Sequence, residues 1–89
     1  MASLRFTQNI QRHVACPNLQ VPGKTLQEAL DAYFAIHPRA RGYVLDDQGA
    51  LRQHMAIFVD GEQLRDILHF SDALRENSVV DVVQALSGG

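Results

Sequence analysis

The sequence has few of the residues that mark several classes of protein. It contains one cysteine, Cys16, so it cannot form an internal disulfide, and a reducing compartment is expected. Lysine and arginine number 8 against 10 acidic residues, and the net charge of −2 offers no basic surface to nucleic acid or an anionic membrane. No apolar run approaches the roughly 18 residues of a membrane span, and the first ten residues lack the apolar core of a signal peptide. These absences predict a small, soluble, cytoplasmic protein.

Motifs for catalysis and metal binding are absent as well. The four histidines lie far apart, outside any zinc-ligand spacing, and the sequence has no phosphate-binding loop or nucleophile elbow. The segment DDQG at residues 46–49 lacks the distal glutamate of a calcium loop and indicates a turn. His13 precedes Cys16 by three residues without a third group to orient the pair, so Cys16 is predicted to be a small core residue. We therefore expect neither an enzyme nor a bound metal or cofactor.

The patterns that are present predict one small α+β domain. Residues 3–8 alternate between polar and apolar, and residues 54–59 and 79–83 are almost continuously apolar, so all three segments are predicted strands. Residues 14–21 contain Pro17 and predict an irregular or edge strand. Residues 62–74 have apolar residues without clean periodicity, which indicates a short strand and then an irregular, partly helical crossover.

One helix is clearly predicted, in the segment TLQEALDAYFAIHP at residues 25–38. Thr25 and Glu28 have the spacing of a capping box, in which each side chain satisfies a free amide at the helix start. Apolar residues follow at helical spacing, and Pro38 ends the helix. Turns are predicted at Pro22-Gly23 and Asp60-Gly61, and residues 39–52 are predicted to be a connection.

The predicted order is strand, strand, helix, strand, crossover, strand, which gives a mixed sheet over one helix. The last strand is placed centrally because it is apolar and contains no proline. The chain then divides into a domain of residues 1–85 and a tail of residues 86–89, with the sequence LSGG. Terminal glycines are costly to order and have no side chain to pack. A tail that leaves the middle of a rigid sheet is therefore interpreted as functional.

Three segments carry a resemblance to a known family. PGKTLQEAL at the start of the helix, HMAIFVDGEQL around the third strand and SVVDVVQALSGG at the end occur in an order that resembles the ubiquitin-like sulfur carriers of the MoaD/ThiS family. The resemblance implies a β-grasp fold, with a mixed sheet of four to five strands wrapped over one main helix. The sequence departs from many members at residues 76–78, where it has Glu-Asn-Ser instead of Gly-Asp-Glu, and in a longer loop at residues 37–52.

The resemblance also implies a chemical role for the tail. A C-terminal carboxylate has a pKa of about 3.3–3.7, so it is ionised at neutral pH and is a poor electrophile. An E1-like adenylating enzyme of the ThiF/MoeB type would consume ATP to adenylate Gly89, and a sulfurtransferase or cysteine desulfurase would supply the sulfur of a thiocarboxylate. An acceptor synthase would use that sulfur for molybdopterin, thiamin, cysteine or a siderophore. Gly88 and Gly89 lack a Cβ and suit a narrow channel.

The sequence also offers candidate partner-binding residues, and it leaves open two alternatives to the sulfur-carrier function. Leu86 is interpreted as an anchor on the partner and Ser87 as a spacer. Phe6, Phe58 and Val83 are candidates for a partner-binding sheet face, although large apolar side chains in a small domain are usually core residues. Alternatively, the protein is a ubiquitin-like modifier that is conjugated through Gly89 to target lysines, with one lysine of its own for chains. A plain interaction module with an idle Gly-Gly is the third interpretation.

Overall fold

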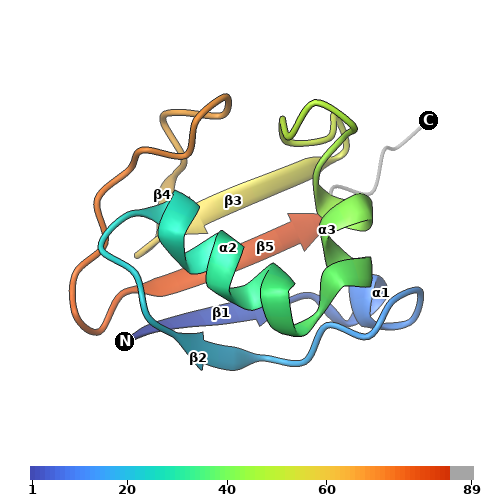
Figure 1. Cartoon of the computed structure of the whole chain (residues 1–89), viewed down its shortest axis with the longest axis horizontal. Helices are drawn as coiled ribbons and strands as arrows, with labels where there is room; N and C mark the ends of the chain where they lie inside the picture. Colours follow the sequence, from blue (N-terminus) through green and yellow to red (C-terminus); the bar gives the residue numbers. More distant parts are fainter. Residues whose placement is uncertain (85–89) are drawn as a thin grey trace.

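The computed structural model describes residues 1–84, which form a five-stranded sheet with helices packed on one face (Figure 1). The strands are β1 (Ala2–Phe6), β2 (Leu19–Val21), β3 (Met55–Val59), β4 (Glu62–Gln63) and β5 (Val79–Gln84). The helices are α1 (Gln8–Gln11), α2 (Leu26–Ile36) and α3 (Pro38–Val44). The predicted tail, and with it the boundary between residues 85 and 86, lies outside the described residues.

The sheet is mixed, and its strand order is β2-β1-β5-β3-β4. β5 runs parallel to β1, with Val80 opposite Leu4, and antiparallel to β3, with Val82 opposite Ile57. The prediction that the last strand is central is confirmed. The prediction of an edge strand near Pro17 is confirmed by β2, which pairs with β1 alone.

The core lies between the inner face of the sheet and α2. Alternate residues of β1 and β5 are buried, and the predicted apolar stripe of α2 covers them. The buried members of the stripe are Leu26, Ala29, Leu30, Tyr33 and Phe34. The Tyr33 hydroxyl, although buried, donates a hydrogen bond to the carbonyl of Pro17 at 2.8 Å, so this polar atom is satisfied inside the core.

The start of α2 is held by the predicted cap and by the crossover. The Thr25 side chain accepts a hydrogen bond from the amide of Glu28, and the Glu28 carboxylate accepts one from the amide of Lys24. The next amides, those of Leu26 and Gln27, donate to carbonyls of the crossover, at 2.9 and 2.8 Å. All these amides would lack a partner in an isolated helix, so the crossover fixes α2 as much as its own cap does.

Residues 39–52, predicted to be a connection, begin with a helix instead. His37 ends α2 and also precedes α3, and Pro38 is the first residue of α3. Proline suits the first helical position because the missing amide has no partner there. The single turn of α1 is also an element that the polar residues after β1 did not predict. The predicted turn at residues 46–49 is confirmed, since the carboxylate of Asp46 accepts from the amides of Gln48 and Ala50.

The crossover between β4 and β5 contains no helix in the described chain, so the prediction that it is partly helical is wrong. Two carboxylates hold its turns. Asp66 accepts hydrogen bonds from the amides of Leu68, His69 and Ser71 and from the Ser71 hydroxyl. Asp72 accepts from the amides of residues 65 and 66. These local bonds compete with helical ones and determine the conformation.

Candidate functional site

The candidate site is the end of β5, where the chain passes into the predicted tail. Gln84, the last residue of β5, lies opposite Met55 of β3. The arrowhead of β5 in Figure 1 lies beside α1 and α3. The predicted site residues of the tail, Leu86, Ser87, Gly88 and Gly89, fall outside the described residues. What the structure describes is the platform that precedes them: a central strand paired along both of its edges.

The outer face of the sheet, opposite the helices, carries two of the three predicted partner-binding residues. Phe58 of β3 and Val83 of β5 are half-buried there, and Ala56 lies directly across from Val83. We refer to Ala56, Phe58 and Val83 as the sheet-face patch. A shallow hollow on this face is lined by Phe58 and Val83 and by the side chains of Arg5 and Asp81.

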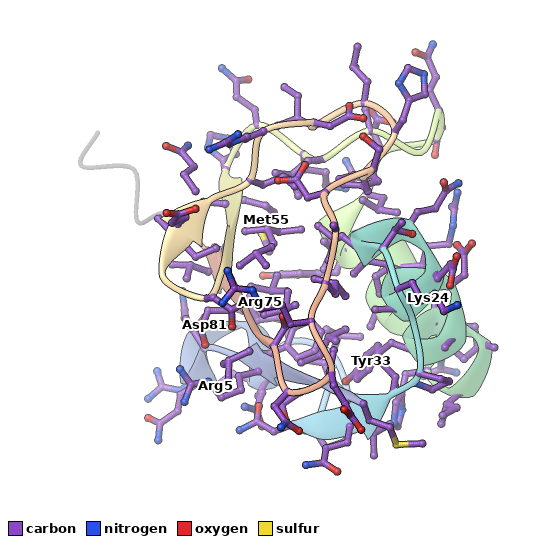
Figure 2. The ribbon with its side chains drawn as sticks, turned by 90° about the vertical axis from the view of Figure 1, so that its left-hand side faces the viewer. Arg5, Lys24, Tyr33, Met55, Arg75 and Asp81 are labelled. Atoms are coloured by element: carbon purple, nitrogen blue, oxygen red, sulfur yellow. The ribbon has the colours of Figure 1, made fainter. Side chains whose placement is uncertain are left out.

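Arg5 and Asp81 form an ion pair at the border of the sheet-face patch. Arg5 of β1, Asp81 of β5 and Phe58 of β3 occupy one row across the sheet. The guanidinium donates two hydrogen bonds to the carboxylate, at 2.7 and 3.0 Å, and these bonds raise the pKa of Arg5. Figure 2 shows both side chains on the side of the sheet away from Tyr33. Asp81 therefore faces solvent, as its alternation with valines predicts, and contacts an arginine of its own chain.

Phe6 lies on the opposite side from the other two candidates. It is 5% exposed, and its ring centroid is 4.8 Å from that of Tyr33. It pairs with Val82, a residue of the buried row of β5, although it also contributes to the lining of the hollow. The structure thus places Phe6 in the core, which is the alternative already weighed for all three residues, and brings only Phe58 and Val83 together on the outer face.

The residues considered for other chemistry have structural roles. Cys16 is buried, and desolvation raises the pKa of its thiol, which is the opposite of what a reactive cysteine needs. Within residues 1–84 no three potential metal ligands gather in one place. None of the helices in that part of the chain has the length and apolar character needed to cross a membrane.

A larger hollow lies between β4 and the crossover, lined by four acidic residues and by Arg65 and Arg75. Three of its four carboxylates accept hydrogen bonds from the chain. Asp66 and Asp72 bind crossover amides, and Asp60 accepts from the amide of Val79 and the hydroxyl of Ser78, at 2.8 and 2.7 Å. Both bonds lower the pKa of Asp60, and the bond from the amide of Val79 has the larger effect. These three carboxylates therefore stabilise the turns around the hollow.

Comparison with known protein families shows the family to which the chain belongs. A family model described as the ThiS family matches residues 14–89, which is well over half of the sequence, and the chain belongs to this family. The fold is the ubiquitin-like β-grasp that the resemblance implied. A search by sequence among curated proteins found no match.

Solved structures with the same fold cover almost the whole chain. Small archaeal modifier protein 1 (SAMP1) from Haloferax volcanii is 24% identical, with a TM-score of 0.78, and the alignment covers 99% of this chain and 98% of that one. A chain of the BexX/CysO complex from Amycolatopsis orientalis is 14% identical, with a TM-score of 0.82 and full coverage of both chains. CysO from Mycobacterium tuberculosis is 17% identical, with a TM-score of 0.80, covering 97% of this chain and 100% of that one.

Proposed function

We propose that the protein is a cytoplasmic sulfur carrier that acts through Gly89. An E1-like adenylating enzyme joins the carboxylate of Gly89 to the α-phosphate of ATP and releases pyrophosphate. The persulfide of a sulfur donor, a sulfurtransferase or cysteine desulfurase, then attacks the acyl carbon and releases AMP, which leaves an acyl disulfide between Gly89 and the donor. A second thiol attacks the donor sulfur of this bond, so that a disulfide forms on the donor and a thiocarboxylate remains on Gly89. An acceptor synthase takes up this sulfur, in a pathway of the molybdopterin, thiamin, cysteine or siderophore type. In this proposal the protein is a carrier and not the enzyme, and ATP is consumed by its partner.

The observation that carries the proposal is the family match, which extends to residue 89 and so includes Gly88 and Gly89. The position of β5 supports it, because the chain enters the tail from a strand that is hydrogen-bonded on both sides. Adenylation answers the chemical difficulty of the site, since it replaces a poorly electrophilic carboxylate by an acyl group with a good leaving group. Glycines without a Cβ permit the close approach that this chemistry requires.

The sheet-face patch is the surface through which we propose that the adenylating enzyme docks. Phe58 and Val83 are apolar and half-buried, and they lie on the two strands next to the start of the tail. Aromatic residues and arginines are enriched among residues that dominate protein interfaces, and Arg5 lies beside this patch. Leu86 serves as the anchor on the partner and Ser87 as the spacer, whereas Phe6 supports the sheet from the core.

Variants of Gly89 test the proposal in a reconstituted reaction. The 89-residue chain is mixed with ATP and a ThiF/MoeB-type enzyme, and ATP–pyrophosphate exchange is measured. The wild type should support exchange, a chain that ends at Gly88 should not, and Gly89→Ala should lower kcat/KM by about tenfold or more because the added methyl group obstructs the approach to the acyl carbon. Gln20→Ala, exposed on the edge strand β2 and distant from the sheet-face patch, is the matched control. Undiminished activation of the chain that ends at Gly88 would refute the proposal.

A second candidate is conjugation to proteins, as in a ubiquitin-like modifier. Three of the similar structures are of small archaeal modifier protein 1, and the activation of the tail would begin in the same way. Lys24 is the only lysine and is exposed, so chains of this protein on itself would require that one residue. Lysine-linked adducts in cell extract, detected by mass spectrometry of tryptic peptides, would favour the modifier over the carrier.

A further inference from the structure

Gln84 interrupts the buried row of β5. In this strand Val80 and Val82 face the helices and are 0% and 1% exposed, and Gln84 is the next residue in the same row. An apolar side chain at this position would simply continue the core. A glutamine instead brings an amide group into a half-buried environment, where its polar atoms need hydrogen-bond partners.

The partners come from the two short helices that flank the end of β5 (Figure 1). The hydroxyl of Tyr43, in α3, donates to Oε1 of Gln84 at 3.2 Å. Nδ2 of Asn9, in α1, donates to the same oxygen at 3.4 Å. The ring of His13 stacks on Tyr43 with centroids 5.9 Å apart and an angle of 16° between the planes, which restrains Tyr43. We call Gln84, Tyr43 and Asn9 the tail clamp.

The tail clamp brings together three segments that are distant from one another in the sequence. Tyr43 and Gln84 are 41 positions apart, and Asn9 and Gln84 are 75 apart. The clamp acts on the last residue of the central strand. Strand ends without such contacts open locally at a low cost in free energy, whereas hydrogen bonds to two helices raise the free energy needed to open the end of β5.

We propose that the tail clamp is a positioning device, which fixes where and in which direction the chain passes from β5 into residues 85–89. The inference rests on the proposed function and adds to it the residues that present the tail to the adenylating enzyme. A chain whose exit from the domain is already fixed loses less conformational entropy when a partner binds the tail. Gln84, Tyr43 and Asn9 are positioning residues in this account, because they act through the tail and not on the reacting atoms.

The first test measures the clamp in the isolated protein. Tyr43→Phe removes one hydroxyl and keeps the ring that stacks on His13, and Gln84→Ala removes the acceptor. Backbone ¹⁵N relaxation should give Gln84 of the wild type an order parameter near 0.85, and the position should fall toward roughly 0.6 in both variants. Val80 should not change, and neither should any residue in the control Gln63→Ala. Order parameters at position 84 that stay at the wild-type value in both variants would overturn the proposal.

The second test measures activation by the adenylating enzyme. Both variants should raise KM by about three- to tenfold with kcat within about twofold, because the loss lies in ordering the tail before the chemistry. The double variant should be no worse than Gln84→Ala alone, since the two residues share one hydrogen bond. Fully additive effects, or an unchanged KM together with a lowered order parameter, would overturn the positioning role and leave the proposed function intact. A wild-type chain that is never adenylated would overturn both, and this result is distinct from the others.

Discussion

Gly23 shows how a single residue sets the geometry at the start of α2. A Cβ at this position would lie 2.7 Å from the amide nitrogen of Ala29 and 3.0 Å from its Cα. Both are backbone atoms of α2 and cannot rotate away as a flexible side chain could. The Pro22-Gly23 pair predicts a turn from sequence, but the close approach to Ala29 is a tertiary contact that the local pattern does not contain.

We expect Gly23→Ala to lower the free energy of unfolding by about 1–3 kcal/mol, because the methyl group would force α2 away from the chain that precedes it. Urea denaturation followed by circular dichroism would measure the change. Gly42→Ala is the matched control, since a Cβ there meets nothing within 4 Å, and in α3 it should be neutral or stabilising by up to about 1 kcal/mol. Equal stability of the two variants would contradict this account of Gly23.

At the scale of elements, the predictions from sequence succeed where local pattern and tertiary packing agree. β5 is predicted because its residues are β-branched and free of proline, and α2 because it has both a capping box and an apolar stripe. α3 could not be predicted in the same way. Pro38 is at once the signal that ends α2 and the first residue of the next helix, and only Ala40 and Val44 of α3 are buried.

The crossover shows the opposite case, in which the sequence pattern is misleading. Its apolar residues lack clean periodicity and indicate a partly helical segment, yet Ile67 and Leu68 are exposed, and Phe70 is buried with a φ of 55°. The conformation follows from the carboxylate of Asp66, whose bonds to the Ser71 hydroxyl and to the amide of His69 lower its pKa to about 2. Such bonds between side chain and backbone have no periodicity that a sequence would reveal.

The lowered pKa of Asp66 predicts how the stability of the crossover depends on pH. The folded value of about 2 lies below the ordinary 3.8, so the stabilisation is present above about pH 4 and is lost as the pH falls toward 2. We expect Asp66→Asn to be less stable than the wild type at pH 7 and the difference to shrink between pH 5 and pH 2. Urea denaturation across this range would measure it, with Asp47→Asn, at an exposed turn position, as control. A difference that does not vary with pH would show that the charge of Asp66 is unimportant.

At the scale of the whole molecule, β5 joins the core, the outer face and the start of the tail. Its inner row packs against α2, and its outer row contributes Asp81 and Val83 to the exposed face. The position of Asp81 among valines is sufficient to place Val83 on the same face of β5 as Asp81. The run at residues 54–59 is apolar on both faces, so the choice between Phe58 and Phe6 required knowing which face α2 covers. The hydrogen bonds of Gln84 could not be predicted at all, because their donors are on helices that the sequence pattern did not indicate.

The sheet-face patch predicts a loss of partner binding without a loss of fold. Truncation of Phe58 to Ala, or of Val83 to Ala, should weaken binding to the adenylating enzyme by about tenfold, the effect of removing an apolar anchor from an interface. Isothermal titration calorimetry would measure the dissociation constant, and thermal denaturation would check the fold. Gln20→Ala, on the edge strand β2, is the matched control. Unchanged affinity in both truncated variants would exclude this face as the docking surface.

The mass of the reacted chain tests the central claim most directly. The 89-residue protein would be incubated with ATP, the adenylating enzyme and a sulfur donor, and its intact mass and the fragments of its last peptide would be recorded. The sulfur-carrier account predicts a mass increase equal to the exchange of one oxygen for one sulfur, confined to Gly89. An unchanged mass under these conditions, or sulfur at any residue other than Gly89, would contradict it.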